Sequence, residues 1–409
     1  MPIEITSHLP VHERQKELCG KPVILTFTGY YLPGYKAGGI LRNIVNTIDN
    51  MCDEFEFKII TRDRDLGDEK PYPNIKVNEW QSVGNAQVYY LSPDSETVAD
   101  LYRLICSSHH HIIFLTSFFD PFTIKVLLNR KLRTELFKPT IVAPFGEFAW
   151  ASLGQKYLKK YIYIQMARLL GLYNSVTWRV SSEYEAFDVT KVMKTRAESI
   201  HVTGDLPIKC IPEISIDSVP PPSSECAGLK VVFISRIARE KNLDYALKTL
   251  SKVRGIVFFD IYGPAENLEY WDECQKLIAK MPANVTVNYL GKVHSAKVIE
   301  VFGYYDLFFF PTGGEAYGNV IAESLTAGTP VLLSTETPWR NLQSDGLGWD
   351  IPLDEMDAFV DVIDNFSISS EEQRQEKRSA VKTRSLERLF DPNVLESNRQ
   401  LFIKQLSTL

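Results

Sequence analysis

Long apolar runs are missing from this 409-residue sequence. No stretch approaches the roughly 18 apolar residues that a membrane-spanning helix needs. Residues 1–20 are polar and lack the hydrophobic core of a signal peptide. The sequence therefore argues against a transmembrane class of protein, and we expect a cytoplasmic location.

Metal and disulfide motifs are also missing. The six cysteines stand far apart with no CxxC pair, so neither a zinc site nor a disulfide framework is predicted. The triplet His109–His111 does not suggest a metal site either, because neighbouring side chains on a strand point to opposite faces. The acidic run at 63–68 follows an expected strand, and we predict a solvated loop there. No motif that reads DNA or RNA is present.

A strongly basic or acidic balance is absent, since the net charge is only -6. Hydrophobic residues make up 44% of the chain and charged residues 23%, which is typical of globular proteins. Residues 101–200 differ from the rest, with 14 Lys and Arg against 7 Asp and Glu. This basic region fits an anionic partner.

What the chain does contain is an alternation of apolar runs and helical patterns, such as the helix expected over 39–51. Strands separated by helices indicate a mostly parallel sheet. We expect strands at 21–28, 55–61, 86–92, 111–117, 139–145, and again at 229–235, 257–263, 285–291, 307–312 and 329–334. The length also suits two domains. The predicted fold class is α/β, with two Rossmann-like doubly wound domains facing a cleft.

Three consecutive prolines break this alternation at 220–222, and proline cannot join a central strand or helix. We therefore predict a linker at 207–228 between an N-terminal domain at 1–206 and a C-terminal domain at 229–390. Residues 391–409 are expected to form a helical tail that can return to the N-terminal domain. Ligands bind at the carboxyl ends of strands in such sheets, so the chemistry should lie in the loops there.

The segment GGEAYGNVIAESLTAGTPVLLS (313–334) combines an exit loop, a helix and a strand. Glu315 lies in the loop and Glu323 nearly two turns into the helix. Gly318, Asn319 and Val320 begin that helix, where N–H groups and the positive end of the helix dipole favour an anion. Each glutamate alone also fits a solvated surface position, but their combination is much more specific.

Two cations and several glycines follow other expected strands. Arg236 and Lys241 lie in the loop after the strand at 229–235, where a planar guanidinium and an ammonium can neutralise a diphosphate. A basic surface loop is the alternative. Gly263 ends the next strand. Gly38 and Gly39 precede the first helix, where they either let the backbone approach a ligand or form a plain turn.

The pair of glutamates with seven residues between them, followed by AGTPVLLS, resembles the signature of family 4 retaining glycosyltransferases of the GT-B fold. The resemblance implies a nucleoside-diphosphate-sugar donor of UDP or GDP type, with no metal and no further cofactor. Glu315 would hold hydroxyls of the donor sugar and Glu323 the ribose. The amides of Gly318, Asn319 and Val320 would meet the sugar and phosphate. Arg236 and Lys241 match the family's phosphate-binding pair, and Gly38, Gly39 and Gly263 complete the donor site.

The N-terminal half departs from this family in two places. Many members carry a histidine where this chain has Thr116–Phe119, and Phe145 replaces the arginine of a Pro-Arg-Gly-Glu segment. The acceptor-side candidates are Glu147 and Ser117. The segments TPW (337–339) and GLGWDIP (346–352) resemble bacterial surface-polysaccharide members.

The resemblance thus implies a retaining, metal-independent hexosyltransferase that acts on a glycan or lipid-linked saccharide in bacterial O-antigen, capsule or exopolysaccharide synthesis. A same-fold sugar-nucleotide epimerase and a non-catalytic nucleotide-sugar-binding module remain alternatives. The helical segment 155–173 carries Lys156, Lys159, Lys160 and Arg168 among apolar residues. It suits a peripheral contact with anionic lipid at the inner face of the membrane, or ordinary packing on its own domain.

Overall fold

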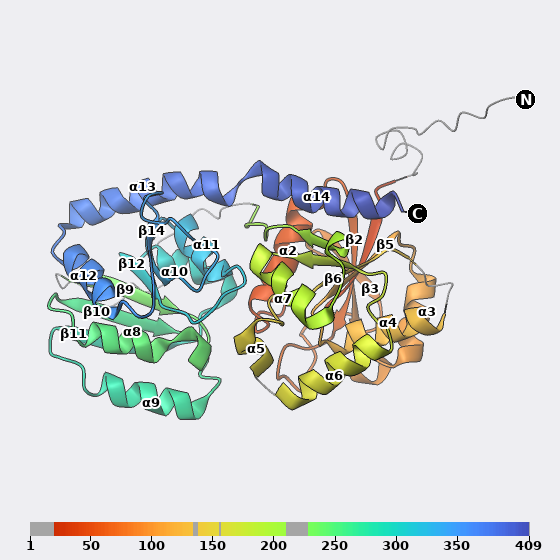
Figure 1. Cartoon of the computed structure of the whole chain (residues 1–409), viewed down its shortest axis with the longest axis horizontal. Coiled ribbons are helices and arrows are strands. Elements are labelled where there is room, and N and C mark those ends of the chain that lie inside the picture. The colour runs from red at the N-terminus through yellow and green to blue at the C-terminus, as the bar shows by residue number, and fades with distance from the viewer. Residues whose placement is uncertain (1–19, 134–137, 155–156, 210–227, 409) are drawn as a thin grey trace, which may run out of the picture. The chain divides into compact units, whose positions relative to one another are not determined.

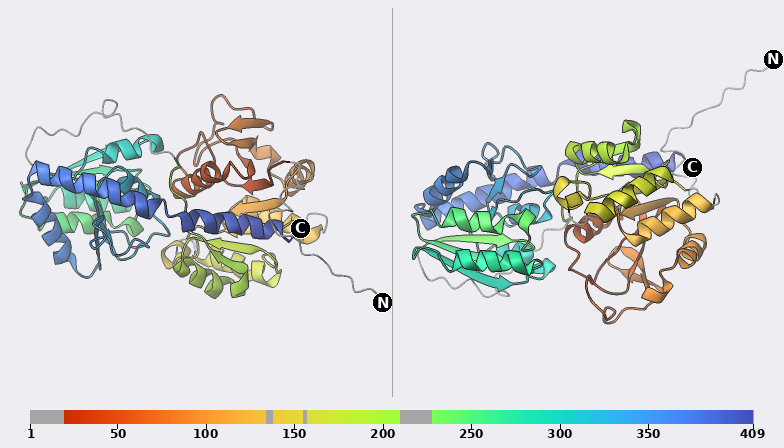
Figure 2. Two further views of the ribbon diagram at one scale, coloured as in Figure 1. Left: turned by 90° about the horizontal axis from the view of Figure 1, so that it is seen from above. Right: turned by 60° about the horizontal axis from the view of Figure 1, so that its bottom comes forward.

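The computed structural model describes residues 20–133, 138–154, 157–209 and 228–408. The chain divides into two compact units, each with a sheet covered by helices on both faces (Figures 1 and 2). Unit 1 takes the chain up to Ala149, residues 156–204 and Asn393–Leu409, and unit 2 takes 150–155 and 205–392. The predicted α/β class with two Rossmann-like domains is confirmed. Most of the predicted linker, residues 210–227, lies outside the described residues.

Unit 1 is built on a sheet with the strand order β3-β4-β2-β1-β5-β6-β7-β8. Its strands are β1 (Val23–Phe27), β2 (Glu56–Arg62), β3 (Trp80–Val83), β4 (Ala86–Leu91), β5 (Ile112–Thr116), β6 (Thr140–Ala143), β7 (Thr177–Val180) and β8 (Ile200–Val202). All neighbours pair in parallel except β3 and β4. The central strands β1 and β5 are buried along their whole length, as expected for a parallel sheet with both faces covered.

The helices of unit 1 include one from the far end of the chain. They are α2 (Gly39–Met51), α3 (Val98–Ser107), α4 (Pro121–Leu132), α6 (Tyr157–Leu169), α7 (Glu183–Met193) and α14 (Pro392–Leu406). Phe402 of α14 packs against Phe55, Phe57 and Phe114, with ring centroids 5.4, 6.2 and 5.9 Å away. The core of unit 1 therefore depends on a helix that the chain reaches only after passing through unit 2.

Unit 2 contains a parallel sheet with the strand order β11-β10-β9-β12-β13-β14. The strands are β9 (Leu229–Ile234), β10 (Val257–Tyr262), β11 (Val285–Gly291), β12 (Leu307–Phe310), β13 (Val331–Ser334) and β14 (Gly348–Ile351). The helices are α5 (Trp150–Gly154), α8 (Leu243–Leu250), α9 (Leu268–Ile278), α10 (Val298–Phe302), α11 (Asn319–Thr326), α12 (Met356–Ser367) and α13 (Glu371–Leu389). None of the described helices in either unit is long and apolar enough to cross a membrane.

Strand β9 fixes where a ligand site can form in unit 2. It pairs with β10 on one side and with β12 on the other, so the strand order reverses at β9. Connections from neighbouring strands then leave in opposite directions and open a crevice at the carboxyl edge. The loops after β9, β10 and β12 all begin at that edge.

Candidate functional site

The closest contact between predicted site residues joins the loops after β9 and β12. Lys241 Nζ donates a hydrogen bond to Glu315 Oε1 over 2.5 Å, and only 10% and 18% of the two side chains are exposed. Charges shielded from water in this way interact more strongly than charges on an open surface. An ammonium group has three donors, so the bond to Glu315 leaves two for another acceptor, such as a phosphate oxygen.

The Glu315 loop is held in place by the backbone of the neighbouring loop. The carbonyl of Glu240 accepts from the N–H of Gly313 (2.7 Å) and from the hydroxyl of Thr312 (3.1 Å). The N–H of Glu315 donates to the carbonyl of Glu336 over 3.1 Å, which ties the loop to the exit of β13. These contacts fix the Glu315 backbone, so its carboxylate is positioned before any ligand arrives.

Helix α11 starts directly beside Glu315. Gly318 is its N-cap with φ 82°, in the left-handed region that favours glycine. A Cβ at Gly318 would lie 3.6 Å from Glu315 Cγ, which shows how close the helix start is to that side chain. Asn319 and Glu323 stand four residues apart and so share one face of the helix. The helix start, Glu315 and Lys241 therefore form one cluster.

Arg236 is less firmly placed than Lys241. Its side chain is 46% exposed and pairs with Glu266 (2.6 Å) and Glu240 (3.4 Å). Exposed ion pairs contribute little free energy, so an anionic ligand could replace these carboxylates at small cost. Gly263 lies against the same loop: with φ 142°, its Cβ would come within 1.7 Å of the Ser235 carbonyl oxygen. Glycine thus allows the loops after β9 and β10 to pack together.

In unit 1, the acceptor-side candidates Ser117 and Glu147 contact each other. The Ser117 hydroxyl donates to Glu147 Oε1 over 2.6 Å, and the Phe118 N–H donates to the other carboxyl oxygen. Burial of this carboxyl group raises the pKa of Glu147 to about 7, although these hydrogen bonds oppose the shift. Gly38 and Gly39 lie elsewhere in unit 1, where Gly38 is the N-cap of α2 with φ 63°.

A second buried carboxylate, Glu185 of α7, fixes the loop that carries Glu147. It accepts from the N–H of Gly146 (2.5 Å), the N–H of Ser181 (2.7 Å) and the Ser181 hydroxyl (2.8 Å). Burial raises the pKa of Glu185 as well. The loop after β6 is therefore anchored from both sides by acidic side chains.

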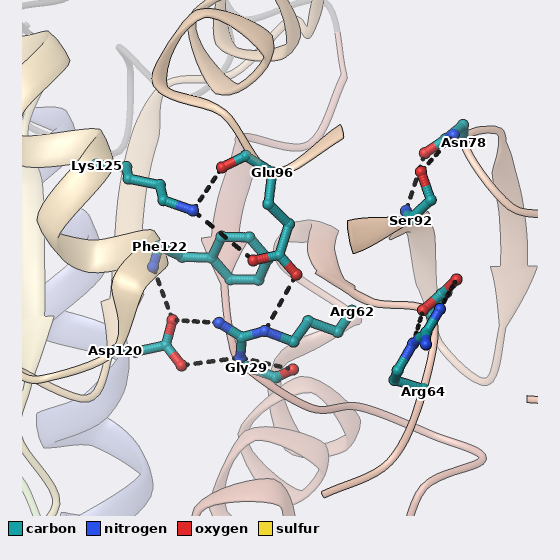
Figure 3. A network of polar contacts seen from close by, with 10 residues as sticks. Gly29, Arg62, Arg64, Asn78, Ser92, Glu96, Asp120, Phe122 and Lys125 are labelled. Carbon is teal, nitrogen blue, oxygen red and sulfur yellow. Dashed lines mark hydrogen bonds and ion pairs between the residues drawn. The ribbon is translucent and has the colours of Figure 1, made fainter. Parts of the chain in front are cut away.

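A network around Arg62, at the end of β2, links further loops of unit 1 (Figure 3). The guanidinium contacts Asp120 (3.1 Å) and Glu96 (3.2 Å) and lies 4.6 Å from the centroid of the Phe122 ring. Lys125 also pairs with Glu96, over 3.8 Å. The network joins the end of β2 to the start of α4, and sequence reasoning did not find it. Each member is an ordinary charged residue until the sheet brings the strand ends together.

The prediction of a solvated loop at 63–68 is wrong for its first half, whereas residues 66–68 are exposed. Asp63 and Asp65 are each only 3% exposed. Asp65 is buried because its Oδ2 accepts from the N–H groups of Tyr35 (2.8 Å) and Lys36 (3.2 Å). The loop thus braces the glycine-containing segment after β1. Among the described residues, no group of three or more His, Cys, Asp or Glu side chains is arranged to hold a metal ion.

The chain is similar to known proteins in part of its sequence and in its fold. A family model described as "Glycosyl transferases group 1" matches residues 227–383. The chain is 25% identical over 138 residues to the GtfA subunit of the UDP-N-acetylglucosamine–peptide N-acetylglucosaminyltransferase of Streptococcus pneumoniae, covering 33% of this chain and 26% of that protein.

Two solved structures show the fold over nearly the whole chain. HepE of Anabaena, solved in complex with UDP and glucose, is 14% identical with a TM-score of 0.63, covering 95% of this chain and all (100%) of that one. Sucrose-phosphate synthase of Thermosynechococcus elongatus is 13% identical with a TM-score of 0.66 at the same coverage of 95% and 100%. Residues 227–383 thus match the glycosyl transferases group 1 family, and the chain has the two-domain GT-B fold.

Proposed function

We propose that the protein is a retaining glycosyltransferase that moves a hexose-type sugar from a nucleoside diphosphate to a hydroxyl of a glycan acceptor. The observation that carries this proposal is the Lys241–Glu315 pair beside the start of α11. This cluster gathers a cation for phosphate, a carboxylate for sugar hydroxyls and helix N–H groups for negative charge. UDP is the preferred nucleotide of the donor, since HepE is described with UDP-glucose and GtfA by its UDP-N-acetylglucosamine donor. A GDP-sugar is the other candidate.

In this proposal the donor lies along the carboxyl edge of unit 2. Glu315 accepts hydrogen bonds from sugar hydroxyls, Lys241 and Arg236 hold the diphosphate, and the amides of Gly318, Asn319 and Val320 receive the remaining phosphate charge. Glu323 holds the ribose. Gly263 lets the backbone near Arg236 approach the phosphates.

The transfer step needs no protein nucleophile. The bond between the anomeric carbon and the phosphate oxygen breaks, and its electron pair stays on the nucleoside diphosphate. The acceptor hydroxyl forms the new bond on the face that the leaving group vacates, and a departing phosphate oxygen takes its proton. The sugar therefore keeps its anomeric configuration, and fixed cations stabilise the leaving group in place of a metal.

The acceptor is proposed to be a lipid-linked saccharide in bacterial surface-polysaccharide synthesis. This rests on the TPW (337–339) and GLGWDIP (346–352) segments, and it implies peripheral contact with the inner face of the cytoplasmic membrane. Ser117 and Glu147 remain the candidates on the acceptor side. Glu147 would act by fixing the loop after β5, because its carboxyl group already accepts from Ser117 and Phe118.

Thermal unfolding with a panel of UDP- and GDP-sugars tests the donor. A ligand at 100 times its dissociation constant adds about 2.7 kcal/mol to the free energy of unfolding. We expect one UDP-sugar to stabilise the wild type and to stabilise Glu315→Gln much less. Failure of every nucleotide-sugar to shift the transition would contradict the proposal.

The alternatives give different outcomes with the same materials. An epimerase would convert the nucleotide-sugar when no acceptor is present. A non-catalytic module would bind the donor yet neither hydrolyse nor transfer it. For a retaining transferase, proton NMR of the first product should show the anomeric configuration of the donor, and an inverted linkage would refute the mechanism.

A further inference from the structure

Helix α6 turns an apolar face to the solvent, which is the reverse of what a surface helix usually does. Leu158, Ile162, Met166 and Leu169 are 69%, 50%, 55% and 87% exposed. Their spacing places all four on one side of the helix. Ordinary packing on unit 1 uses the other side, where Ile164 and Ala167 are buried. The exposed side therefore has no partner among the described residues.

The neighbouring helix α7 adds to this surface. It packs against α6, as Figure 2 shows, and its Tyr184 and Phe187 are 73% and 65% exposed. We use the name apolar face for these two residues together with Leu158, Ile162, Met166 and Leu169 of α6. Large exposed apolar side chains grouped in this way mark sites that bind another apolar surface.

A cationic hollow adjoins the apolar face at the end of α6. It has a volume of about 480 Å³, and its lining includes Leu169, Arg168 and Lys194. Among the described residues, no carboxylate forms an ion pair with Arg168 or Lys194. Trp178 also lines the hollow; it is 1% exposed, and its indole N–H has no hydrogen-bond partner among the described groups. The two cations are the groups that would receive an anion.

We propose that the apolar face and this hollow form a membrane-docking surface for a bilayer that contains anionic phospholipids. The apolar face would enter the boundary between headgroups and acyl chains, and Arg168 and Lys194 would hold a headgroup phosphate. The charge of the surface favours lipid over a second copy of the chain, because a two-fold contact would bring the same cations together. The proposal does not depend on the sugar-transfer reaction.

Flotation of the full chain with lipid vesicles tests the docking surface. Vesicles of phosphatidylcholine alone are compared with vesicles of phosphatidylcholine and phosphatidylglycerol in equal parts. We expect binding to the anionic vesicles, weaker binding to the neutral ones, and a loss of binding as the salt concentration rises. Absence of binding to both kinds of vesicle would overturn the proposal, and so would equal binding to both.

Paired variants separate the two components of the surface. Ile162→Asn with Leu169→Asn should abolish binding, whereas Leu268→Asn with Ile368→Asn, at positions 69% and 83% exposed in unit 2, should leave it unchanged. Arg168→Gln with Lys194→Gln should weaken binding by about fivefold for each cation removed. The matched control is Lys276→Gln with Lys280→Gln on and just after α9.

All these positions except half-buried Arg168 are exposed, and thermal unfolding should confirm that each variant is folded. If the asparagine variant binds vesicles as the wild type does, the apolar face is not the docking surface. If the wild type instead forms a dimer that this variant abolishes, and no vesicle binding is seen, a second copy of the chain occupies the face and the lipid proposal is wrong.

Discussion

Glu315 and Lys241 depend on each other because neither side chain has much access to water. Removing one partner of such a pair leaves the other charge without compensation, which costs up to about 3–5 kcal/mol when burial is complete. The surface pairs of Arg236 behave differently, since an exposed ion pair contributes at most about 1 kcal/mol. Residues of the same cluster should therefore respond differently to substitution.

The first prediction concerns Glu315→Gln. The amide keeps the shape of the side chain but removes a charged acceptor, a loss of about 1.5–3 kcal/mol in transition-state binding. We expect kcat/KM for sugar transfer to fall roughly ten- to a hundredfold. Glu336→Gln is the control, because Glu336 is exposed and contacts the loop only through its carbonyl. Wild-type turnover in Glu315→Gln would remove Glu315 from the site.

The second prediction contrasts Lys241→Ala with Arg236→Ala. Both should reduce transfer strongly, because each removes a cation from the diphosphate. Only Lys241→Ala should also lower the free energy of unfolding, since it leaves Glu315 without its partner. Urea denaturation measures this difference. Arg239→Ala is the control: its partner Glu273 is 50% exposed, so neither stability nor transfer should change much.

The third prediction is that transfer does not depend on a divalent metal. If Arg236, Lys241 and the start of α11 stabilise the leaving diphosphate, excess EDTA should leave the rate of the wild type nearly unchanged. The measurement is the initial rate with EDTA, with magnesium and with manganese. Activity that EDTA abolishes and either metal restores would show that a metal carries this charge.

At the scale of elements, the loops after β5 and β6 meet at the carboxyl group of Glu147, which can gain or lose a proton. The carboxyl group of Glu147 is buried against Ser117 and Phe118, and its pKa lies at about 7 instead of the ordinary 4.5. Because the pKa of Glu147 is raised in the folded state, its protonated carboxyl group contributes fully to the free energy of unfolding below pH 4.5. This contribution is lost as the pH rises through about 7. The gap corresponds to about 3 kcal/mol as an order of magnitude.

The fourth prediction follows from this contact. Glu147→Gln should flatten the decline in the free energy of unfolding between about pH 5 and pH 8, because the amide does not ionise. The glutamine can keep both contacts, since the Ser117 hydroxyl can accept as well as donate. Urea denaturation across this pH range measures the effect, with exposed Glu183→Gln as the control. An unchanged slope in Glu147→Gln would mean that the carboxyl group titrates normally.

The elements that the sequence predicts are those with continuous apolar runs. Strands such as β1 and β12 are buried at every position, which makes their sequence easy to recognise. Strands β3, β7, β8 and β14 escaped prediction because they are short and mix polar residues with apolar ones. Their place depends on the neighbouring strand rather than on their own composition.

The same limit applies to the candidate site. Local sequence was enough to suggest Lys241 and Glu315, because each follows an apolar strand and belongs to a recognisable motif. The carbonyl of Glu240 and the hydroxyl of Thr312 hold the Glu315 loop, and nothing in their identity marks them. Such contacts depend on backbone geometry after folding, as does the burial of Asp65.

At the scale of the whole molecule, helix α14 brings the C-terminal residues of the chain into unit 1, which otherwise consists of residues before 205. Phe402 is 2% exposed and sits among Phe55, Phe57 and Phe114. Its contacts lie within unit 1, although residues 205–392 of unit 2 separate it from the rest of that unit. Stability of unit 1 should therefore depend on α14, and stability of unit 2 should not.

The fifth prediction tests this dependence. Phe402→Ala should lower the free energy of unfolding of unit 1 by about 3–5 kcal/mol, because it leaves a cavity among aromatic rings. Phe390→Ala, at a position 37% exposed just before α14, is the control and should cost about 1 kcal/mol or less. Urea denaturation should show one early transition in Phe402→Ala. A single shift of both units together would contradict their separate stability.

The return of the chain to unit 1 has a consequence for synthesis on the ribosome. Nearly all of unit 2, residues 205–392, is translated between Gly204 and Asn393, both of which belong to unit 1. At 5–20 residues per second, this interval lasts roughly 10–40 s. During this interval, the rings of Phe55, Phe57 and Phe114 lack their contacts with Phe402 of α14, because that helix has not yet been synthesised. Unit 2 can meanwhile already form its own core. The half of the protein that is made first is thus the half that is finished last, and its open apolar surface is where a chaperone would bind the nascent chain.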